Sequence, residues 1–397
     1  LHCASYGNQP GWIFCLSYNG DPEKCFGENS VFRIGGIDVI NTFFEHAPFS
    51  LTREEKRKLL SARSRELTRH HYNNCTEYER ILDAIGFELN SETTYEDIPF
   101  LPVSLFKKTD LKSIAENNVF KVMTSSGTTG QAVSKIYLDR ETSALQQKVL
   151  AKIFSDFAGS ARLPMIIIDC PSVIKSRAMF SARGAGILGF SMFGSQKIYA
   201  LNDDMSLNVD LVKAFIESHK NKPIFLFGFT FMIWQHFCQE LKKYPAKYFD
   251  LSNGILIHGG GWKKLESENI STEMFKETLF ERCGIERVHN YYGMVEQTGS
   301  IYMECECGHL HASIFSDILV RRPKDFSICK NGEKGIIQVV SAIPQSYPGH
   351  SVLTEDEGAI LGEDDCPCGR KGKYFSIYGR LKNAEIRGCS DTYAVGF

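Results

Sequence analysis

The run MTSSGTTGQAVSK, residues 123–135, gathers hydroxyl groups and glycines in a stretch that is too small and polar to form core. Gly127 and Gly130 permit the positive φ values that turn successive backbone N–H groups toward one anion. Such donors are typical of a phosphate-binding loop. The run is not a P-loop, because the nearest lysine, Lys135, lies five residues past Gly130. Taken alone, the run fits a flexible polar turn equally well.

Two short clusters of soft ligands lie further along the chain, CECGHLH at 305–311 and CPCG at 366–369. Thiolate and imidazole ligands in two such clusters suit a tetrahedral structural zinc ion that joins distant segments. Ordinary free cysteines are the alternative, because the spacing C-x-C is less diagnostic than C-x-x-C. The preferred ligands are Cys305, His311, Cys366 and Cys368, and Cys307 is the substitute.

Composition excludes several function classes. The 397 residues are 43% hydrophobic and 23% charged, which is ordinary for a globular chain of two or three domains of roughly 150 residues each. The formal net charge of −2 gives no global field for nucleic acid or an anionic membrane. No apolar run reaches the roughly 18 residues of a membrane span, and no signal peptide is evident. We therefore predict a cytoplasmic protein, in which clustered cysteines indicate metal or chemistry rather than disulfides.

Apolar runs alternate with helical stretches through the middle of the chain, which predicts an α/β fold with a largely parallel sheet flanked by helices. Ligands on such a sheet lie at the carboxyl ends of the strands. We expect a smaller antiparallel β subdomain after it. The predicted parallel strands are at 165–169, 196–201, 223–229, 254–261 and 286–293, and the antiparallel ones are at 332–343, 352–361 and 374–380.

We predict four regions: an N-terminal extension of unknown role at 1–48, an α/β core at 49–331, the small β subdomain at 332–380, and a hinge with a truncated tail at 381–397. Thr52 and Glu55 form a capping box that begins a charged helix. The basic surface of that helix is expected to be a solvated face rather than a ligand site.

Four motifs in order resemble those of the adenylate-forming enzymes, the superfamily of acyl-CoA ligases and related synthetases. TSSGTTG resembles its phosphate loop, and NYYGMVEQTG at 290–299 resembles its aromatic-Gly-x-x-Glu segment. LTEDEG at 353–358 resembles the segment with the ribose-binding aspartate, and GRLKNAEIRG at 379–388 resembles the hinge. Together the motifs cover much of the chain, and their shared order is far more specific than any one of them.

Within that superfamily the chain is most similar to the acyl-protein synthetases of bacterial fatty acid reductases in bioluminescence, which are related to phenylacetate–CoA ligases. The similar segments run from about residue 50 to the end and include IPFLPVSLFK, FGFTFMIW, HGGGWK, YYGMVEQTGSIYMECE and RGCSDTY. The resemblance implies an enzyme that uses ATP and Mg²⁺ to convert a fatty acid to acyl-AMP, and a partner protein of the acyl-CoA reductase or acyltransferase type.

The resemblance also implies a role for each motif residue. Glu296 is expected to bind Mg²⁺, Asp356 the ribose hydroxyls, and Arg380 ribose or phosphate. Tyr291 and Tyr292, followed by Gly293, offer a ring to stack on adenine. The β- and γ-phosphates are expected to contact the loop residues Thr124, Ser125, Ser126, Gly127, Thr128, Thr129 and Gly130.

Cys389 is the predicted acyl acceptor. It lies in RGCSDTY, where Arg387 would favour the thiolate, which is the attacking form of a cysteine, and the resemblance implies that it takes the acyl group from the adenylate. Other adenylate-forming enzymes continue past the hinge into a lid that carries a lysine used in adenylation. Here only residues 383–397 follow Lys382, so we expect that lid to be missing.

Two other functions remain open at this point. The chain could be a ligase that passes the acyl group to coenzyme A or a carrier protein, which the short C-terminus disfavours. Alternatively, it could be a degenerate adenylate-binding, zinc-stabilised interaction protein without turnover. The presence of Thr128, Glu296 and Asp356 argues against such decay.

Overall fold

The computed structural model describes residues 39–125, 132–175, 182–261 and 270–381. All of them belong to one compact unit. The helices are α1 (Val39–Phe43), α2 (Arg53–Asn74), α3 (Thr76–Ala84), α4 (Leu105–Lys108), η2 (Glu116–Asn118), α5 (Arg140–Ala158), α6 (Ser172–Lys175), α7 (Ala182–Ser191), α8 (Val209–His219), α9 (Thr230–Met232), η3 (Ile233–Cys238), α10 (Gln239–Leu241), α12 (Thr272–Cys283) and η4 (Val295–Gln297).

The described strands form a 12-stranded sheet and a separate two-stranded sheet, β2–β3. The strands are β1 (Leu101–Pro102), β2 (Lys121–Thr124), β3 (Lys135–Leu138), β4 (Leu163–Ile168), β5 (Gly194–Tyr199), β6 (Ile224–Phe229), β7 (Gly254–Gly259), β8 (Arg287–Tyr292), β9 (Tyr302–Glu304), β10 (Leu310–His311), β11 (Ser316–Arg321), β12 (Gly335–Ser341), β13 (Ser351–Glu363) and β14 (Lys373–Arg380).

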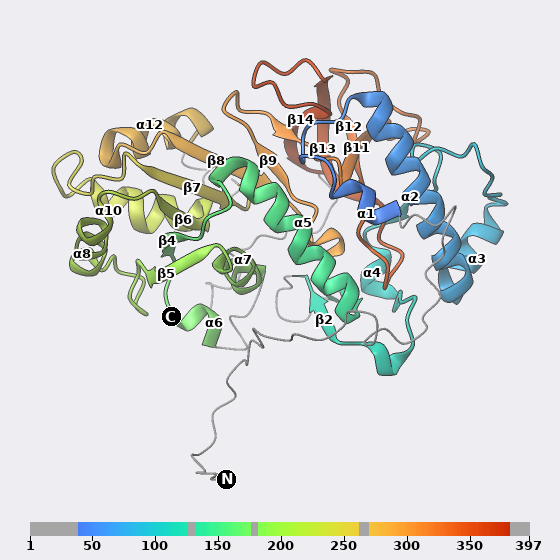
Figure 1. Ribbon diagram of the computed structural model, residues 1–397, viewed down its shortest axis with the longest axis horizontal. Helices are drawn as coiled ribbons and strands as arrows, with labels where there is room; N and C mark the ends of the chain where they lie inside the picture. Colours follow the sequence, from blue (N-terminus) through green and yellow to red (C-terminus); the bar gives the residue numbers. More distant parts are fainter. Residues whose placement is uncertain (1–38, 126–131, 176–181, 262–269, 382–397) are drawn as a thin grey trace, which may run out of the picture. The chain divides into compact units, whose positions relative to one another are not determined.

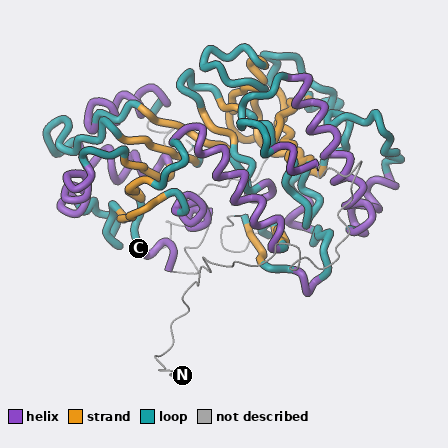
Figure 2. The backbone as a smooth tube through the Cα atoms, in the orientation of Figure 1, coloured by secondary structure: helices purple, strands orange, loops and turns teal. Residues whose placement is uncertain are grey.

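The large sheet has a parallel half and an antiparallel half. Strands β5, β4, β6, β7 and β8 pair in parallel, in that spatial order. They match the five strands predicted from apolar runs, and α7, α8, α10 and α12 surround them (Figure 1; Figure 2 shows these helices in purple around the orange strands). The remaining main-path strands, β9 to β14, pair in antiparallel fashion. The predicted α/β fold class is confirmed.

A two-residue strand, β10, links β14 to β9, which pairs with the last parallel strand, β8. Leu310 of β10 pairs with Glu304 of β9 on one side and with Phe375 of β14 on the other. The predicted antiparallel strands at 332–380 are present as β12, β13 and β14, and through β10 they continue the large sheet. The domain boundaries at residues 48, 331 and 380 stay predictions.

Helix α2 begins as the sequence predicts, but two of its basic side chains are buried. The Thr52 backbone N–H donates to the Glu55 carboxylate at 2.9 Å, as in a capping box. Lys56 and Arg63 each keep only 2% of their surface exposed. The expectation of a solvated basic face is wrong for these two residues, because α2 packs against the antiparallel half, where Asp317 lies 3.3 Å from the Lys56 ammonium.

The apolar core follows the two halves of the sheet. The larger cluster surrounds the parallel strands and includes Ile167 and Phe227. The second cluster lies at the antiparallel strands, includes Val339, and also takes in Ile136 and Leu138 from the β2–β3 hairpin. Among the described helices, none combines the length and the apolar character that crossing a membrane requires.

Candidate active site

The predicted phosphate loop joins the two strands of the β2–β3 hairpin. Thr124 ends β2 and lies opposite Lys135, the first residue of β3. The Ser125 N–H donates to the Ser134 carbonyl at 3.2 Å, and the Ser134 N–H donates to Ser125 Oγ at 2.9 Å. These two bonds close the base of the loop. The following loop residues lie outside the described part of the chain: Ser126, Gly127, Thr128, Thr129 and Gly130.

Three residues from distant motifs come together at the antiparallel half. Asp356 of β13 lies opposite Arg380 of β14, and its Oδ1 is 3.7 Å from Arg380 Nε. The Tyr292 hydroxyl, from β8, donates to Asp356 Oδ2 at 2.8 Å. Burial and the nearby carboxylate raise the pKa of Tyr292 well above 10, so it remains a donor. A carboxylate has about four lone-pair sites, so Asp356 can still accept further hydroxyl groups.

The two tyrosines predicted to flank adenine have different surroundings. Side chains alternate along a strand, and Tyr291 packs with the cluster of the parallel half whereas Tyr292 packs with the other cluster. The Tyr291 ring covers Gly259, where an added Cβ would lie 2.3 Å from Tyr291 Cε1. It also lies 5.1 Å from the Phe190 ring. The stacking role of the two tyrosines stays a prediction, and Gly293 is exposed.

Glu296, the predicted Mg²⁺ ligand, lies in the one-turn helix η4 and is only 5% exposed. The Tyr347 hydroxyl donates to its backbone carbonyl at 2.8 Å. The Gln297 amide donates to the carbonyl groups of Val339 at 3.1 Å and Gly349 at 2.8 Å. These contacts fix the turn that carries Glu296. Sequence reasoning missed Tyr347, which belongs to none of the four motifs, and Gln297, which lies in NYYGMVEQTG but carries no ionisable group.

Thr354 is a third positioning residue that sequence reasoning missed. Its hydroxyl donates to the Ile337 carbonyl at 2.8 Å and accepts the Asp356 N–H at 3.1 Å. The only sequence signal for Thr354 was its place in LTEDEG, two residues before the aspartate. The predicted nucleophile Cys389 and the hinge residue Lys382 lie outside the described residues.

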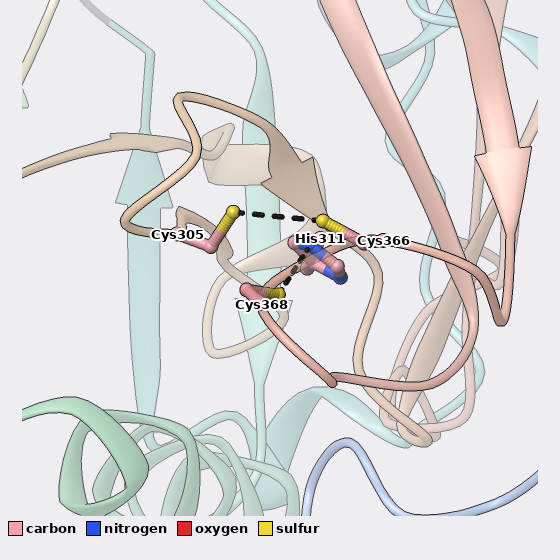
Figure 3. Close-up of side chains that lie close together, drawn as sticks. All are labelled: Cys305, His311, Cys366 and Cys368. Atoms are coloured by element: carbon pink, nitrogen blue, oxygen red, sulfur yellow. Dashed lines mark hydrogen bonds between the residues drawn. The ribbon is translucent and has the colours of Figure 1, made fainter.

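The preferred zinc ligands come together at the joint of the sheet. One ligand atom from each of Cys305, His311, Cys366 and Cys368 lies within 4.8 Å of the others (Figure 3). Cys307, the predicted substitute, is exposed and is not part of this group. Burial, together with Arg370 and His309, lowers the pKa of His311 to about 4. Its imidazole is therefore neutral near pH 7, the state in which it can bind a metal.

Comparison with known proteins decides the family. The family model described as acyl-protein synthetase, LuxE, matches residues 32–397. This chain belongs to the LuxE acyl-protein synthetase family. Two long-chain-fatty-acid–luciferin-component ligases are related to this LuxE-family chain. The one from Aliivibrio fischeri is 21% identical over 90% of this chain and 93% of its own, and the one from Vibrio harveyi is 20% identical over 91% and 94%.

Solved structures support the fold. An open conformation of 2-hydroxyisobutyryl-CoA ligase, in complex with 2-HIB-AMP and CoA, matches with a TM-score of 0.64 at 15% identity, over 86% of this chain and 78% of that one. The predicted enzyme class of this LuxE-family chain, an ATP-dependent acid ligase that activates an acyl group, is confirmed. The roles of individual residues stay predictions.

Proposed function

We propose that this enzyme activates a long-chain fatty acid with Mg-ATP and then transfers the acyl group to its own Cys389. In the first step, a carboxylate oxygen of the fatty acid attacks the α-phosphorus of ATP. Pyrophosphate leaves, and acyl-AMP remains. In the second step, the Cys389 thiolate attacks the acyl carbon, the bond to the AMP oxygen breaks, and AMP leaves a thioester. A partner of the acyl-CoA reductase or acyltransferase type then receives the acyl group.

The contact of Asp356 with Tyr292 and Arg380 is the observation that carries the first step. It brings the motif with the predicted ribose ligand beside the aromatic motif and the end of β14, so three of the four recognised motifs meet. The base of the phosphate hairpin packs in the same apolar cluster as Tyr292. The fatty acid is proposed because both related ligases are named for that substrate.

The chemistry requires neutralisation of the crowded negative charge on the phosphates. Glu296 would hold Mg²⁺, which would supply positive charge to the phosphates, and the hydroxyl and N–H groups of the hairpin loop would contact the β- and γ-phosphates. The buried, hydrogen-bonded turn at Glu296 suits this role, because a fixed ligand loses little freedom when the metal binds. Asp356 would accept the ribose hydroxyls while Tyr292 keeps its carboxylate oriented.

Pyrophosphate release with a panel of carboxylic acids tests the activation step. We expect release with Mg-ATP to depend on a long-chain fatty acid, and Glu296→Gln to lower the rate about 100-fold or more, because the metal bridge is lost. Glu277→Gln is the matched control, since Glu277 is an exposed carboxylate on α12. Equal rates in the two variants would refute the assignment of Glu296, and release without any fatty acid would refute the substrate class.

Covalent labelling tests the transfer step. With radiolabelled fatty acid, Cys389→Ser should still release pyrophosphate at the first turnover but should carry no hydroxylamine-labile label. Cys307→Ser, which changes an exposed cysteine, should be labelled normally. Normal labelling of Cys389→Ser would show that another residue accepts the acyl group. Label that appears only on added coenzyme A or on a carrier protein would establish the alternative ligase.

A further inference from the structure

The large sheet is narrow at strand β10, which has two residues, and β8 also pairs with β9 over only two residues. Among the described residues, the main path from β14 to the parallel half runs through the pairing of Leu310 and His311 with β14 on one side and β9 on the other. By contrast, β6 and β7 pair over six residues. A joint with so few backbone hydrogen bonds should open more readily than the strands around it.

Two similar turns approach this joint from opposite sides. In CECG, the Gly308 N–H donates to the Cys305 carbonyl at 3.0 Å, and in CPCG, the Gly369 N–H donates to the Cys366 carbonyl at 2.9 Å. Both glycines have positive φ, 78° and 84°, which favours glycine at these positions. The first turn connects β9 to β10, and the second lies between β13 and β14. Each turn therefore presents cysteine to the joint from a different hairpin.

The spacing of the side chains fits one tetrahedral ion. With zinc–sulfur bonds of about 2.3 Å and zinc–nitrogen bonds of about 2.0 Å, two sulfurs lie about 3.8 Å apart and a sulfur lies about 3.5 Å from a nitrogen. Cys305 Sγ and Cys366 Sγ are 3.9 Å apart, and Cys368 Sγ is 3.4 Å from His311 Nε2 (Figure 3). Figure 3 shows the three sulfurs and the imidazole turned toward one another.

We propose that Cys305, His311, Cys366 and Cys368 bind one Zn²⁺ ion that fastens the β9–β10 hairpin, next to the parallel half, to the β13–β14 hairpin. The three thiols release their protons to solvent when the metal binds, and neutral His311 contributes one nitrogen. Three sulfurs and one nitrogen favour zinc over Mg²⁺ or Ca²⁺, which prefer oxygen ligands. All four protein ligands close the coordination shell, so the site is structural and holds no open position for catalysis.

The metal would act on the nucleotide site through the joint. The Tyr292–Asp356 hydrogen bond connects β8 of the parallel half to β13 of the antiparallel half. Tyr292 lies opposite Tyr302 of β9, three residues before Cys305, and β13 leads directly into the turn with Cys366. Zinc would therefore keep Tyr292 and Asp356 in contact. This consequence rests on the proposed function, whereas metal binding itself does not.

Metal content and cobalt spectroscopy test the site on the full-length protein, purified without a histidine tag or chelator. We expect about one zinc per chain. Replacement by Co²⁺ should give the visible bands of a tetrahedral ion with a thiolate-to-cobalt charge-transfer band. Cys366→Ser and Cys368→Ser should weaken metal affinity more than about 100-fold, because loss of a second-shell partner alone costs about 10- to 100-fold. His311→Cys should keep the metal and shift the cobalt spectrum.

Two cysteine controls make the assignment specific. Cys307→Ser changes an exposed cysteine in the same turn as Cys305, and Cys329→Ser changes a buried cysteine outside the group. Both should keep about one zinc per chain. If the wild-type protein holds no zinc and shows no cobalt bands on titration, the site is refuted, whether or not the ligand variants fold. Equal metal loss in Cys307→Ser and Cys366→Ser would refute the four assigned ligands.

Hydrogen–deuterium exchange tests whether zinc stabilises the joint, independently of catalysis. After zinc is removed from the wild-type protein with a chelator, we expect faster exchange in 302–311 and 373–376, with little change in β6 and β7. Restored zinc should restore the protection. If zinc removal changes the exchange rates of both halves of the sheet equally, zinc does not stabilise the joint, even if it binds. A failed pyrophosphate assay would leave this result intact and would count only against the proposed function.

Discussion

The two halves of the large sheet are held together by different chemistry. In the parallel half, every side chain of β4 and β6 is apolar, and every residue of both strands is buried. In the antiparallel half, β12 is equally buried but carries Gln338 and Ser341, whose side chains bond to Ser351 Oγ at 3.0 Å and Ser300 Oγ at 2.6 Å. Strands β4 and β6 therefore depend on apolar contact, while β12 also depends on each buried polar group having its partner.

This difference explains where the candidate site lies. Binding a nucleotide requires carboxylates and hydroxyl groups at fixed positions, and a core that already contains satisfied polar groups can hold them. Asp356 and Arg380 belong to strands of the antiparallel half, and the parallel half supplies Tyr291 and Tyr292 from its last strand. The site thus lies where the parallel half meets the antiparallel half, beside the joint.

The buried ionic network of the antiparallel half should give the largest mutational effect on stability. Asp317 is 1% exposed and lies 3.3 Å from the Lys56 ammonium and 3.1 Å from that of Lys373. Asp317→Asn leaves the buried Lys56 and the part-buried Lys373 without their counter-charge, so we expect the free energy of unfolding to fall by about 3–5 kcal/mol. Urea denaturation measures it.

A matched change in the parallel half supplies the comparison. Ile167→Val in β4 shortens a fully buried side chain without exposing any polar group, and it should cost about 0.5–1.5 kcal/mol. If Asp317→Asn costs no more than Ile167→Val, then the buried charges do not support the antiparallel half, and the contrast between the two halves fails.

Strands β4 and β6 of the parallel half were predictable from sequence because they are continuous apolar runs, a pattern that local sequence alone displays. Lys56 and Arg63 were mispredicted for the opposite reason. Their burial depends on partners such as Asp317, which lies far along the chain, and the charged pattern of α2 contains no sign of that contact. Nor could one predict that the antiparallel strands continue the large sheet, because β10, which links them to it, has only two residues.

Some features of the candidate site were likewise predictable from sequence, and others were not. Residue type and motif order predicted Glu296, Asp356 and Arg380, and ligand chemistry predicted the four residues that meet at the joint. The separation of Tyr291 from Tyr292 depends on which side of β8 each ring occupies and on the approach of Asp356. A motif that lists two adjacent aromatic residues does not show which one binds the carboxylate, because that partner comes from another strand.

Acid should weaken the antiparallel half through Asp317, with a smaller effect than the mutation. Although burial alone would raise the pKa of Asp317, Lys373 and Lys56 lower it to about 2, from an ordinary value of 3.8. A depressed carboxyl pKa adds stability that is fully present above the unfolded-state value and is lost as the pH falls from 3.8 toward 2. The loss should be about 2 kcal/mol.

Urea denaturation of the wild type and Asp317→Asn between a pH of about 5 and about 2.5 checks this expectation. The difference in unfolding free energy between the two proteins should shrink as the pH falls, because protonated Asp317 carries no charge, as in the asparagine variant. A difference that stays constant over this range would show that Asp317 is not charged in the folded protein at the higher pH.

The smallest expected effect comes from the single hydrogen bond that crosses between the halves at the candidate site. Tyr292→Phe keeps the ring and removes only the hydroxyl that donates to Asp356 Oδ2 at 2.8 Å. A hydrogen bond to a charged group contributes about 1.5–3 kcal/mol, and one between neutral groups about 1 kcal/mol. Because Asp356 is part-exposed and Arg380 also faces it, water and Arg380 can replace part of the lost contact.

We therefore expect the Tyr292→Phe change to cost about 1 kcal/mol and to weaken AMP binding about fivefold, since 1.4 kcal/mol corresponds to a factor of ten. Calorimetric titration with AMP measures the affinity, and Tyr378→Phe is the control, because Tyr378 lies on β14 with 54% of its surface exposed. An unchanged affinity together with lower stability would mean that Tyr292 only joins the two halves. If Tyr292→Phe matches Tyr378→Phe in both measurements, the tyrosine neither positions Asp356 nor connects the halves, and the zinc site alone would have to hold the joint.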